Sequence, residues 1–177
     1  MCLSCDIILR IVLFPGGKSV SARSRRVVEL KIPSQLGYEK VAREAVAAVA
    51  RRMKFPEEKI EDIKTAVSEA CTNAIRYGSG NDVRMKVVVI LTADEEKLDI
   101  LIKDAGVGGT PPMDEVDIPD ISGMVAGKRR LGGMGLYIIK ELVDEAGFLE
   151  PSDDEEGNRF RMVIYRVEDS PVQSNER

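Results

Sequence analysis

Two polar residues in the stretch SEACTNAIRYG, Ser68 to Gly78, have types and a spacing suited to chemistry. Glu69 and Asn73 are four residues apart, so on a helix they lie one above the other on the same side. A carboxylate can orient or deprotonate an attacking hydroxyl group, and an amide oxygen is a ligand that Mg²⁺ accepts. The pair is therefore a candidate for proton transfer beside a bound metal ion.

The same side of this helix also has a simpler interpretation. Glu69 and Asn73 fall roughly opposite the apolar stripe formed by Ile60, Ile63 and Val67. The side of a helix opposite its apolar stripe normally faces solvent. Taken alone, the pair leaves open a solvated polar face without chemistry.

A second motif, DAGVG, follows an expected strand and spans Asp104 to Gly108. Gly106 and Gly108 permit turns and a close approach of the backbone to a flat ligand. The carboxylate of Asp104 could accept a hydrogen bond from an amino group such as that of adenine. An ordinary Asp-x-Gly turn is the alternative.

A third motif, RRLGGMGL, spans Arg129 to Leu136 and runs into an expected helix. Free backbone N–H groups at a helix start bind anions, and neighbouring basic residues add positive charge. The motif contains three glycines, Gly132, Gly133 and Gly135. Its spacing is not that of a dinucleotide-binding loop, and a flexible hinge is the alternative.

The composition excludes several kinds of chemistry. The chain has 177 residues and no histidine, which removes histidine acid–base catalysis, histidine metal ligands and a phosphohistidine relay. A net charge of −4 and a pI near 5.1 predict no general basic surface, and hence no direct nucleic-acid partner. The apolar segment Asp6 to Phe14 contains Arg10 and is far shorter than the roughly 20 residues that span a bilayer, so we expect no membrane segment.

The three cysteines fit a reducing cytosol. Cys2 and Cys5 form a CxxC pair, but no second such pair completes a four-ligand zinc site. A metal or redox role for this pair is therefore the less favoured interpretation. Cys71 lies inside the long helix, and we expect it to be a small core residue.

The periodicity of apolar residues predicts the elements that must position these motifs. Expected strands cover residues 27–33, 83–91, 97–103 and 159–167, with a short strand starting at 148, and expected helices cover 38–53, 56–78 and 136–144. This order predicts an α+β fold, a two-layer α/β sandwich with the helices on one face of a mixed sheet.

The chain divides into one domain and two flanking segments. Residues 1–26 are expected to form a flexible N-terminal extension, 27–167 the folded domain and 168–177 a polar C-terminal tail. Residues 109–131 contain several prolines and glycines and little periodicity. A loop of this length inside a domain is usually a functional lid or disordered.

Together and in this order, the three motifs resemble the nucleotide-binding boxes of the GHKL ATPase superfamily, which has the Bergerat fold. The resemblance covers about residues 27–167. Within that superfamily, the stretches EDIKTAVSEACTNAIRYG and GGMGLYIIKELVDE are most similar to anti-sigma-factor serine/threonine protein kinases of the RsbW type.

The resemblance implies a role for each matching residue. Glu69 would be the catalytic base, Asn73 the magnesium ligand and Asp104 the residue that reads adenine, with Gly106 and Gly108 shaping its pocket. An arginine before the glycine box would meet the terminal phosphate of ATP, and Arg130 is the candidate. The glycine box assigned to nucleotide binding comprises Gly132, Gly133, Met134, Gly135 and Leu136.

The resemblance also implies partners. It implies binding of Mg-ATP, a cytoplasmic homodimer, sequestration of an RNA polymerase sigma factor, and phosphorylation of a serine on a STAS-domain anti-sigma-factor antagonist. Two alternatives stay open: a non-catalytic ATP-binding partner-switch module, and a stressosome-type switch kinase that does not act on a sigma factor. The presence of Glu69 argues against the non-catalytic alternative.

Overall fold

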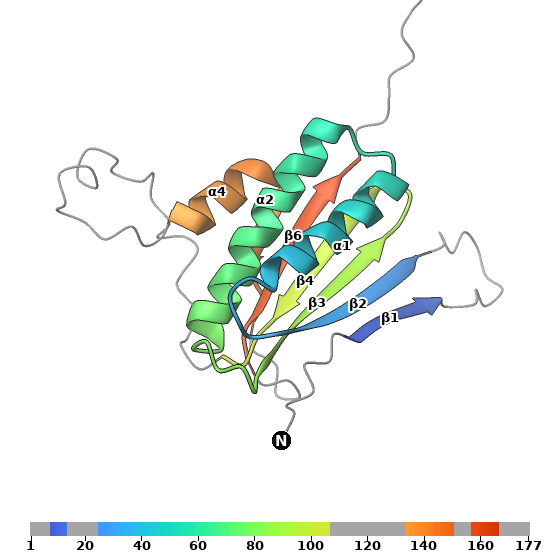
Figure 1. Ribbon diagram of the computed structural model, residues 1–177. Coiled ribbons are helices and arrows are strands. Elements are labelled where there is room, and N and C mark those ends of the chain that lie inside the picture. The colour runs from blue at the N-terminus through green and yellow to red at the C-terminus, as the bar shows by residue number, and fades with distance from the viewer. Residues whose placement is uncertain (1–7, 14–24, 107–133, 151–156, 167–177) are drawn as a thin grey trace, which may run out of the picture.

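The computed structural model describes residues 8–13, 25–106, 134–150 and 157–166. These residues form two layers, with the helices on one face of a single six-stranded sheet (Figure 1). The expected α+β sandwich is therefore confirmed. Residues 1–7, 107–133 and 167–177, which include Cys2, Cys5, the expected lid and the expected tail, lie outside the described part of the chain.

The sheet has the strand order β1-β2-β3-β4-β6-β5, and each described pair of neighbours is antiparallel. The expectation of a mixed sheet is therefore wrong. Strand β6 lies between β4 and β5 in the sheet, so β4 and β5 do not pair. The strands are β1 (Ile8–Leu13), β2 (Arg26–Pro33), β3 (Lys86–Ala93), β4 (Lys97–Lys103), β5 (Glu145–Phe148) and β6 (Arg159–Tyr165).

Strand β1 lies inside the segment that was expected to be a separate extension. It pairs with β2 in a register that runs from Ile8 opposite Lys31 to Leu13 opposite Arg26. Figure 1 shows it at the edge of the sheet, beyond the helical layer. An edge strand of six residues gains most of its stability from one neighbour, and the sequence alone does not identify that neighbour.

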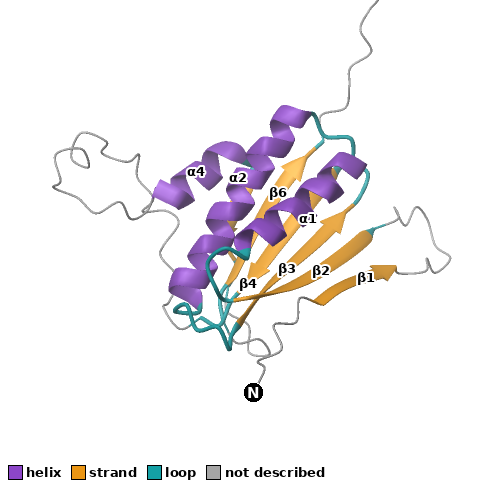
Figure 2. Ribbon diagram, viewed as in Figure 1, coloured by secondary structure: helices purple, strands orange, loops and turns teal. Residues whose placement is uncertain are grey.

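The helical layer contains α1 (Glu39–Arg52), α2 (Glu57–Asn73) and α4 (Met134–Leu142), shown together in Figure 2. The helices begin and end close to the expected positions. One difference is that the expected helix 56–78 changes to a π-helical turn, η1 (Ala74–Gly78), for its last five residues. Among the described residues, no helix is long and apolar enough to cross a membrane.

Strand β3 begins three residues later than expected because a turn precedes it. The carboxylate of Asp82 accepts a hydrogen bond from the backbone N–H of Arg84 at 2.9 Å, and it also pairs with the Arg84 side chain. The N–H of Met85 bonds to the carbonyl oxygen of Asp82. These local bonds hold residues 82–85 in a turn and not in the ladder.

The core lies between the sheet and the helices, and it follows the predicted periodicity. Alternate residues of β3 and β4 are buried on the helical side: Val87, Val89, Leu91, Leu98, Ile100 and Ile102. Helix α2 contributes Ile60, Ile63 and Val67. Cys71 is fully buried, as expected, and burial raises the pKa of its thiol to about 12, so it is an inert core residue.

The first prediction concerns this core. Ile100 is fully buried in the central strand β4, so Ile100→Ala leaves a cavity and should lower the free energy of unfolding by about 2–5 kcal/mol. Val83 is 49% exposed, so Val83→Ala should change it by less than about 0.5 kcal/mol. Urea unfolding measures both, and equal effects would contradict the assignment of the core.

Candidate functional site

Helix α4 brings its second residue against the polar side of α2. A Cβ atom placed on Gly135 would lie 2.8 Å from Oε2 of Glu69 and 3.3 Å from Nδ2 of Asn73. A side chain at this position would require the Glu69 carboxylate to shift, so glycine allows α4 to lie this close without moving Glu69. The structure therefore brings together Glu69, Asn73 and Gly135 of the glycine box.

The polar side of α2 is only partly exposed. Glu69 and Asn73 are both half-buried, because α4 covers part of the surface that would otherwise be solvated. The simpler interpretation, a fully solvated polar face, does not describe this arrangement. A half-buried carboxylate beside an amide and a bare backbone can contact a ligand in a partly dehydrated setting.

The π-helical turn η1 starts immediately after Asn73. The backbone N–H of Ser79 donates a hydrogen bond to the carbonyl oxygen of Ala74, five residues back, at 2.9 Å. The backbone N–H of Asn81 donates to the carbonyl oxygen of Ile75 at 2.9 Å. A π-helical turn inside an α-helix is rare and is frequently found at a functional site. Here it carries the chain from Asn73 to Gly78, where the helix meets the end of β4.

Gly78 is the contact between this helix and Asp104. A Cβ on Gly78 would lie 2.0 Å from Cγ of Asp104, so the carboxyl group occupies the space that a side chain would need. Asn73 and Gly78 are five residues apart on one helical segment, which corresponds to roughly 7 Å along its axis. Asp104 therefore lies against the C-terminal end of the helical segment that carries Asn73.

Asp104 is a half-buried carboxyl group that is held by the backbone around it. Its Oδ1 accepts a hydrogen bond from the N–H of Gly106 at 2.7 Å, and its own N–H bonds to the carbonyl oxygen of Asn158 at 3.1 Å. Burial raises its pKa, while the hydrogen bonds from Gly106 and Asn158 act in the opposite direction. An acceptor that is desolvated and fixed in this way suits recognition of an amino group.

Two glycines whose backbones lie in close contact hold the turn after Asp104. Gly106 and Gly157 have φ angles of 70° and 96°, which favour glycine. A Cβ on Gly157 would lie 2.0 Å from the carbonyl oxygen of Asp104, and one on Gly106 would lie 2.7 Å from Cα of Gly157. The segment before β6 is therefore part of the site.

The sequence analysis missed Gly78, Gly157 and Asn158 as site residues. Gly78 was expected only as the last residue of the helix 56–78, and Gly157 and Asn158 were given no role. Their spacing carries no signal of the long-range contacts with Asp104. Gly108, Arg130, Gly132, Gly133 and the lid at about 109–131 lie outside the described residues, so their expected roles stay predictions.

The remaining residues of the glycine box form the start of α4. Met134 and Gly135 are half-buried in its first turn. The side chain of Leu136 is only 7% exposed and packs in the core. Any contact that Leu136 makes with a ligand would therefore come from its backbone.

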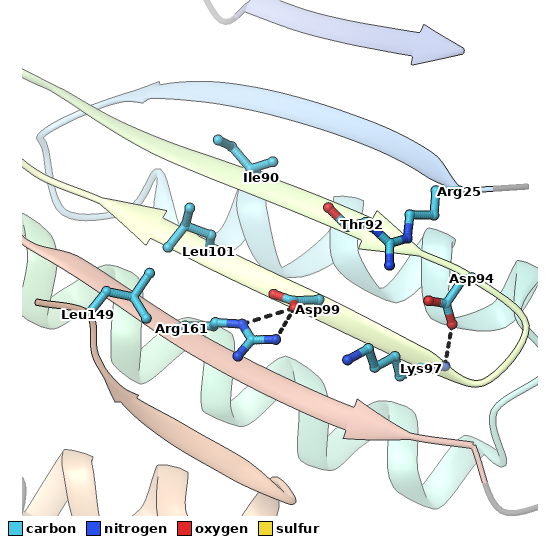
Figure 3. A pocket seen from close by; sticks show the side chains of 9 residues that line it. All are labelled: Arg25, Ile90, Thr92, Asp94, Lys97, Asp99, Leu101, Leu149 and Arg161. Carbon is cyan, nitrogen blue, oxygen red and sulfur yellow. Dashed lines mark hydrogen bonds and ion pairs between the residues drawn. The ribbon is translucent and has the colours of Figure 1, made fainter. Parts of the chain in front are cut away.

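The opposite face of the sheet carries a separate hollow of about 380 Å³. It is shown in Figure 3, where Arg161 donates to Asp99 and the backbone of Lys97 bonds to Asp94. The residues that line it are Arg25, Ile90, Thr92, Asp94, Lys97, Asp99, Leu101, Leu149 and Arg161. Among the residues that the structure describes, none of the predicted site residues lines this hollow.

The described residues contain no cluster of three or more His, Cys, Asp or Glu side chains that could hold a metal ion. A magnesium site at Asn73 needs only one amide oxygen from the protein, because Mg²⁺ keeps waters and substrate phosphates as its other ligands. The donor set around Glu69 and Asn73 is therefore compatible with magnesium that arrives with a nucleotide.

Comparison with known proteins agrees with this geometry. The family model of the histidine kinase-like ATPase domain matches residues 32–164. The serine-protein kinase RsbW of Bacillus subtilis (strain 168) is 33% identical over 119 residues, which cover 67% of this chain and 74% of that protein. The serine-protein kinase RsbW of Bacillus cereus (strain Q1) is 36% identical over 140 residues, which cover 78% of this chain and 84% of that protein.

The close contact between Gly106 and Gly157 yields a second prediction. Gly157→Ala places a Cβ against the Asp104 carbonyl oxygen at a φ angle that alanine disfavours, and it should lower the free energy of unfolding by at least about 2 kcal/mol. Gly147 in β5 has open space around it, so Gly147→Ala should change it by less than about 1 kcal/mol. Urea unfolding measures the free energy of unfolding of both variants. Equal decreases in the two variants would contradict the close contact between Gly157 and the Asp104 backbone.

The raised pKa of Asp104 yields a third prediction. The native state binds this proton more readily than the unfolded state, so the contribution of Asp104 to the free energy of unfolding falls as the pH rises from its ordinary pKa of 3.8 through the raised native value. Asparagine does not titrate, and its Oδ1 still accepts from Gly106. The stability of Asp104→Asn relative to the wild type should therefore increase between pH 4 and pH 7.

Urea unfolding at the two pH values tests this expectation. Asp99→Asn is a control on the open face, outside the site. A relative stability of Asp104→Asn that is the same at both pH values, or that falls, would contradict the assignment of a desolvated carboxyl group.

Proposed function

The chain belongs to the family of histidine kinase-like ATPase domains, and from that membership we propose that it is an ATP-dependent protein kinase that transfers phosphate to serine and acts as an anti-sigma factor. The match over residues 32–164 confirms the resemblance to GHKL proteins. The observation that carries the proposal is the approach of Gly135 to Glu69 and Asn73, since it joins the glycine box to the acid and the amide.

The described residues fit a nucleotide. Because position 135 is a glycine, the Glu69 carboxylate and the Asn73 amide lie close to the backbone at the start of α4. The start of α4 offers N–H groups for phosphate oxygens, and Asp104 offers a fixed acceptor for the adenine amino group. We propose that Gly108, Gly132 and Gly133 add further backbone contacts, and that Arg130 meets the terminal phosphate.

Transfer requires little covalent work from the protein, because phosphoryl transfer depends mostly on positioning and charge neutralisation. In our proposal the serine oxygen attacks the terminal phosphorus of ATP, a new O–P bond forms, and the bond to the bridging oxygen of ADP breaks. Glu69 receives the proton from the serine hydroxyl. Its half-buried position beside α4 keeps the carboxylate close to Gly135 of the glycine box.

Asn73 holds its amide one helical turn beyond Glu69, on the same side of α2. This spacing lets one side chain accept a proton while the other orients the phosphates. A bound magnesium ion supplies positive charge that offsets the charge of the phosphate groups. Asn73 would provide one oxygen ligand for it.

The partners are proposed from the same family likeness. The relatives named above are called serine-protein kinases, which supports a serine acceptor. We propose that this acceptor lies on a STAS-domain anti-sigma-factor antagonist, that the chain sequesters an RNA polymerase sigma factor, and that it works as a cytoplasmic homodimer.

The fourth prediction separates binding from transfer. Glu69→Gln keeps the size of the side chain but cannot accept the proton, so it should retain Mg-ATP binding and lower the rate of transfer to the STAS partner at least about a hundredfold. Asn73→Ala should lose magnesium-dependent binding. Calorimetric titration of Mg-ATP and labelled-phosphate transfer measure the two effects.

The same assays decide between the proposal and its rivals. Transfer by Glu69→Gln at the wild-type rate would reject the base assignment. Mg-ATP binding by the wild type without transfer to any STAS partner would favour the non-catalytic module. Transfer without capture of a sigma factor would favour a switch kinase of the stressosome type.

A further inference from the structure

A lysine near the start of α2 is bonded to the end of α4. Nζ of Lys59 donates a hydrogen bond to the carbonyl oxygen of Leu142 at 2.9 Å, between residues that are 83 apart in the chain. Leu142 is the last residue of α4. The last four carbonyl groups of a helix have no partner within it, so the ammonium group satisfies one of them from another element.

The position of Lys59 is unfavourable for its own helix. It lies in the first turn of α2, next to Glu57 and Glu58. The N-terminal end of a helix carries partial positive charge, which favours acidic residues and disfavours lysine. The C-terminal end of α4 carries the opposite partial charge and favours a cation. The charge of Lys59 therefore stabilises the C-terminal end of α4 and not the start of α2.

Helix α4 is short and packs mainly along α2. It has nine residues, and within it only Leu136 and Ile139 are buried. Figure 1 shows it lying alongside α2. Its packing along α2 includes one contact at each end: Gly135 against Glu69 and Asn73 at its start, and Leu142 against Lys59 at its end.

The two contacts are coupled because a helix of this length moves as a rigid body. From Met134 to Leu142 the axis spans roughly 12 Å. A tilt or slide that releases Leu142 from Lys59 therefore moves Gly135 relative to Glu69. A Cβ on Gly135 would lie 2.8 Å from Oε2 of Glu69, so the backbone at the start of α4 lies close to the Glu69 side chain.

We propose that Lys59 is a positioning residue for the nucleotide, which acts through α4 without touching the ligand. Its bond to Leu142 fixes the place of the glycine box relative to Glu69 and Asn73. The inference rests on the proposed function, because it takes the surface formed by Glu69, Asn73 and the start of α4 as the nucleotide site.

The test compares the full-length wild type with Lys59→Met, Lys59→Arg and Lys64→Met. Methionine keeps an unbranched apolar stem of similar length but removes the charge and the donors, whereas arginine keeps both. Lys64 is a matched control on the same helix, since it bonds only to Glu61 within α2 among the contacts that the structure describes. The readouts are Mg-ATP affinity by calorimetry, amide hydrogen exchange of residues 134–142, and the thermal midpoint.

Lys59→Met should weaken Mg-ATP binding about tenfold, equal to ~1.4 kcal/mol, and speed exchange in α4 by a similar factor. Lys59→Arg should restore both values, and Lys64→Met should match the wild type. Wild-type affinity in Lys59→Met would overturn the positioning role, whatever the exchange shows. Equal losses in Lys59→Met and Lys64→Met would overturn it too, because they would indicate a general loss of stability.

The outcome can be separated from the fate of the proposed function. If the wild type does not bind Mg-ATP, the proposed function fails, and the positioning role fails with it. Faster exchange of α4 in Lys59→Met alone would then still establish the contact as a structural clamp. If the wild type binds Mg-ATP and Lys59→Met binds equally well, the proposed function stands and only this inference is rejected.

Discussion

Helix α2 has to serve two surfaces at once, and the arrangement of the site depends on how it does so. Ile63 and Val67 are fully buried against the sheet, while Glu69 and Asn73 on another side stay half-buried. Complete burial of an unpaired carboxylate would cost far more than the apolar contacts gain. A second helix can therefore cover this side only in part, and α4 does so through a residue without a side chain, Gly135.

Glycines, which have no side chain, also form the other end of the site. The carboxyl group of Asp104 fits against Gly78, and the backbone of Gly157 fits against the carbonyl oxygen of Asp104. These close approaches let the ends of η1 and β4 and the start of β6 meet at one place. Each glycine lowers the local stability of its segment. The close approaches that the glycines allow hold the Asp104 carboxyl group through backbone contacts from two directions.

Local patterns in the sequence predicted most of the elements and the residues on which the candidate site is built. Periodicity was enough for α1, α2 and β4, because their buried residues repeat within a single element. Glu69, Asn73 and Asp104 were found because their residue types stand out against that pattern. Strand β1, the π-helical turn and the Asn158 contact depend on which distant segments meet, and the antiparallel sheet depends on β6 lying between β4 and β5. No single stretch of residues contains that information.

The residues that stabilise β4 differ from the residue at its end for which we propose a chemical role. Within β4, Leu98, Ile100 and Ile102 are buried with almost no exposure, and their burial stabilises the sheet. Asp104 follows directly after the strand, and burial raises its pKa, so its ionised form destabilises the fold at neutral pH. A carboxyl group in this position can be tolerated because the apolar residues that precede it hold the end of β4 in place. The same rigidity keeps the acceptor in one orientation, which is the property that recognition of a flat ligand requires.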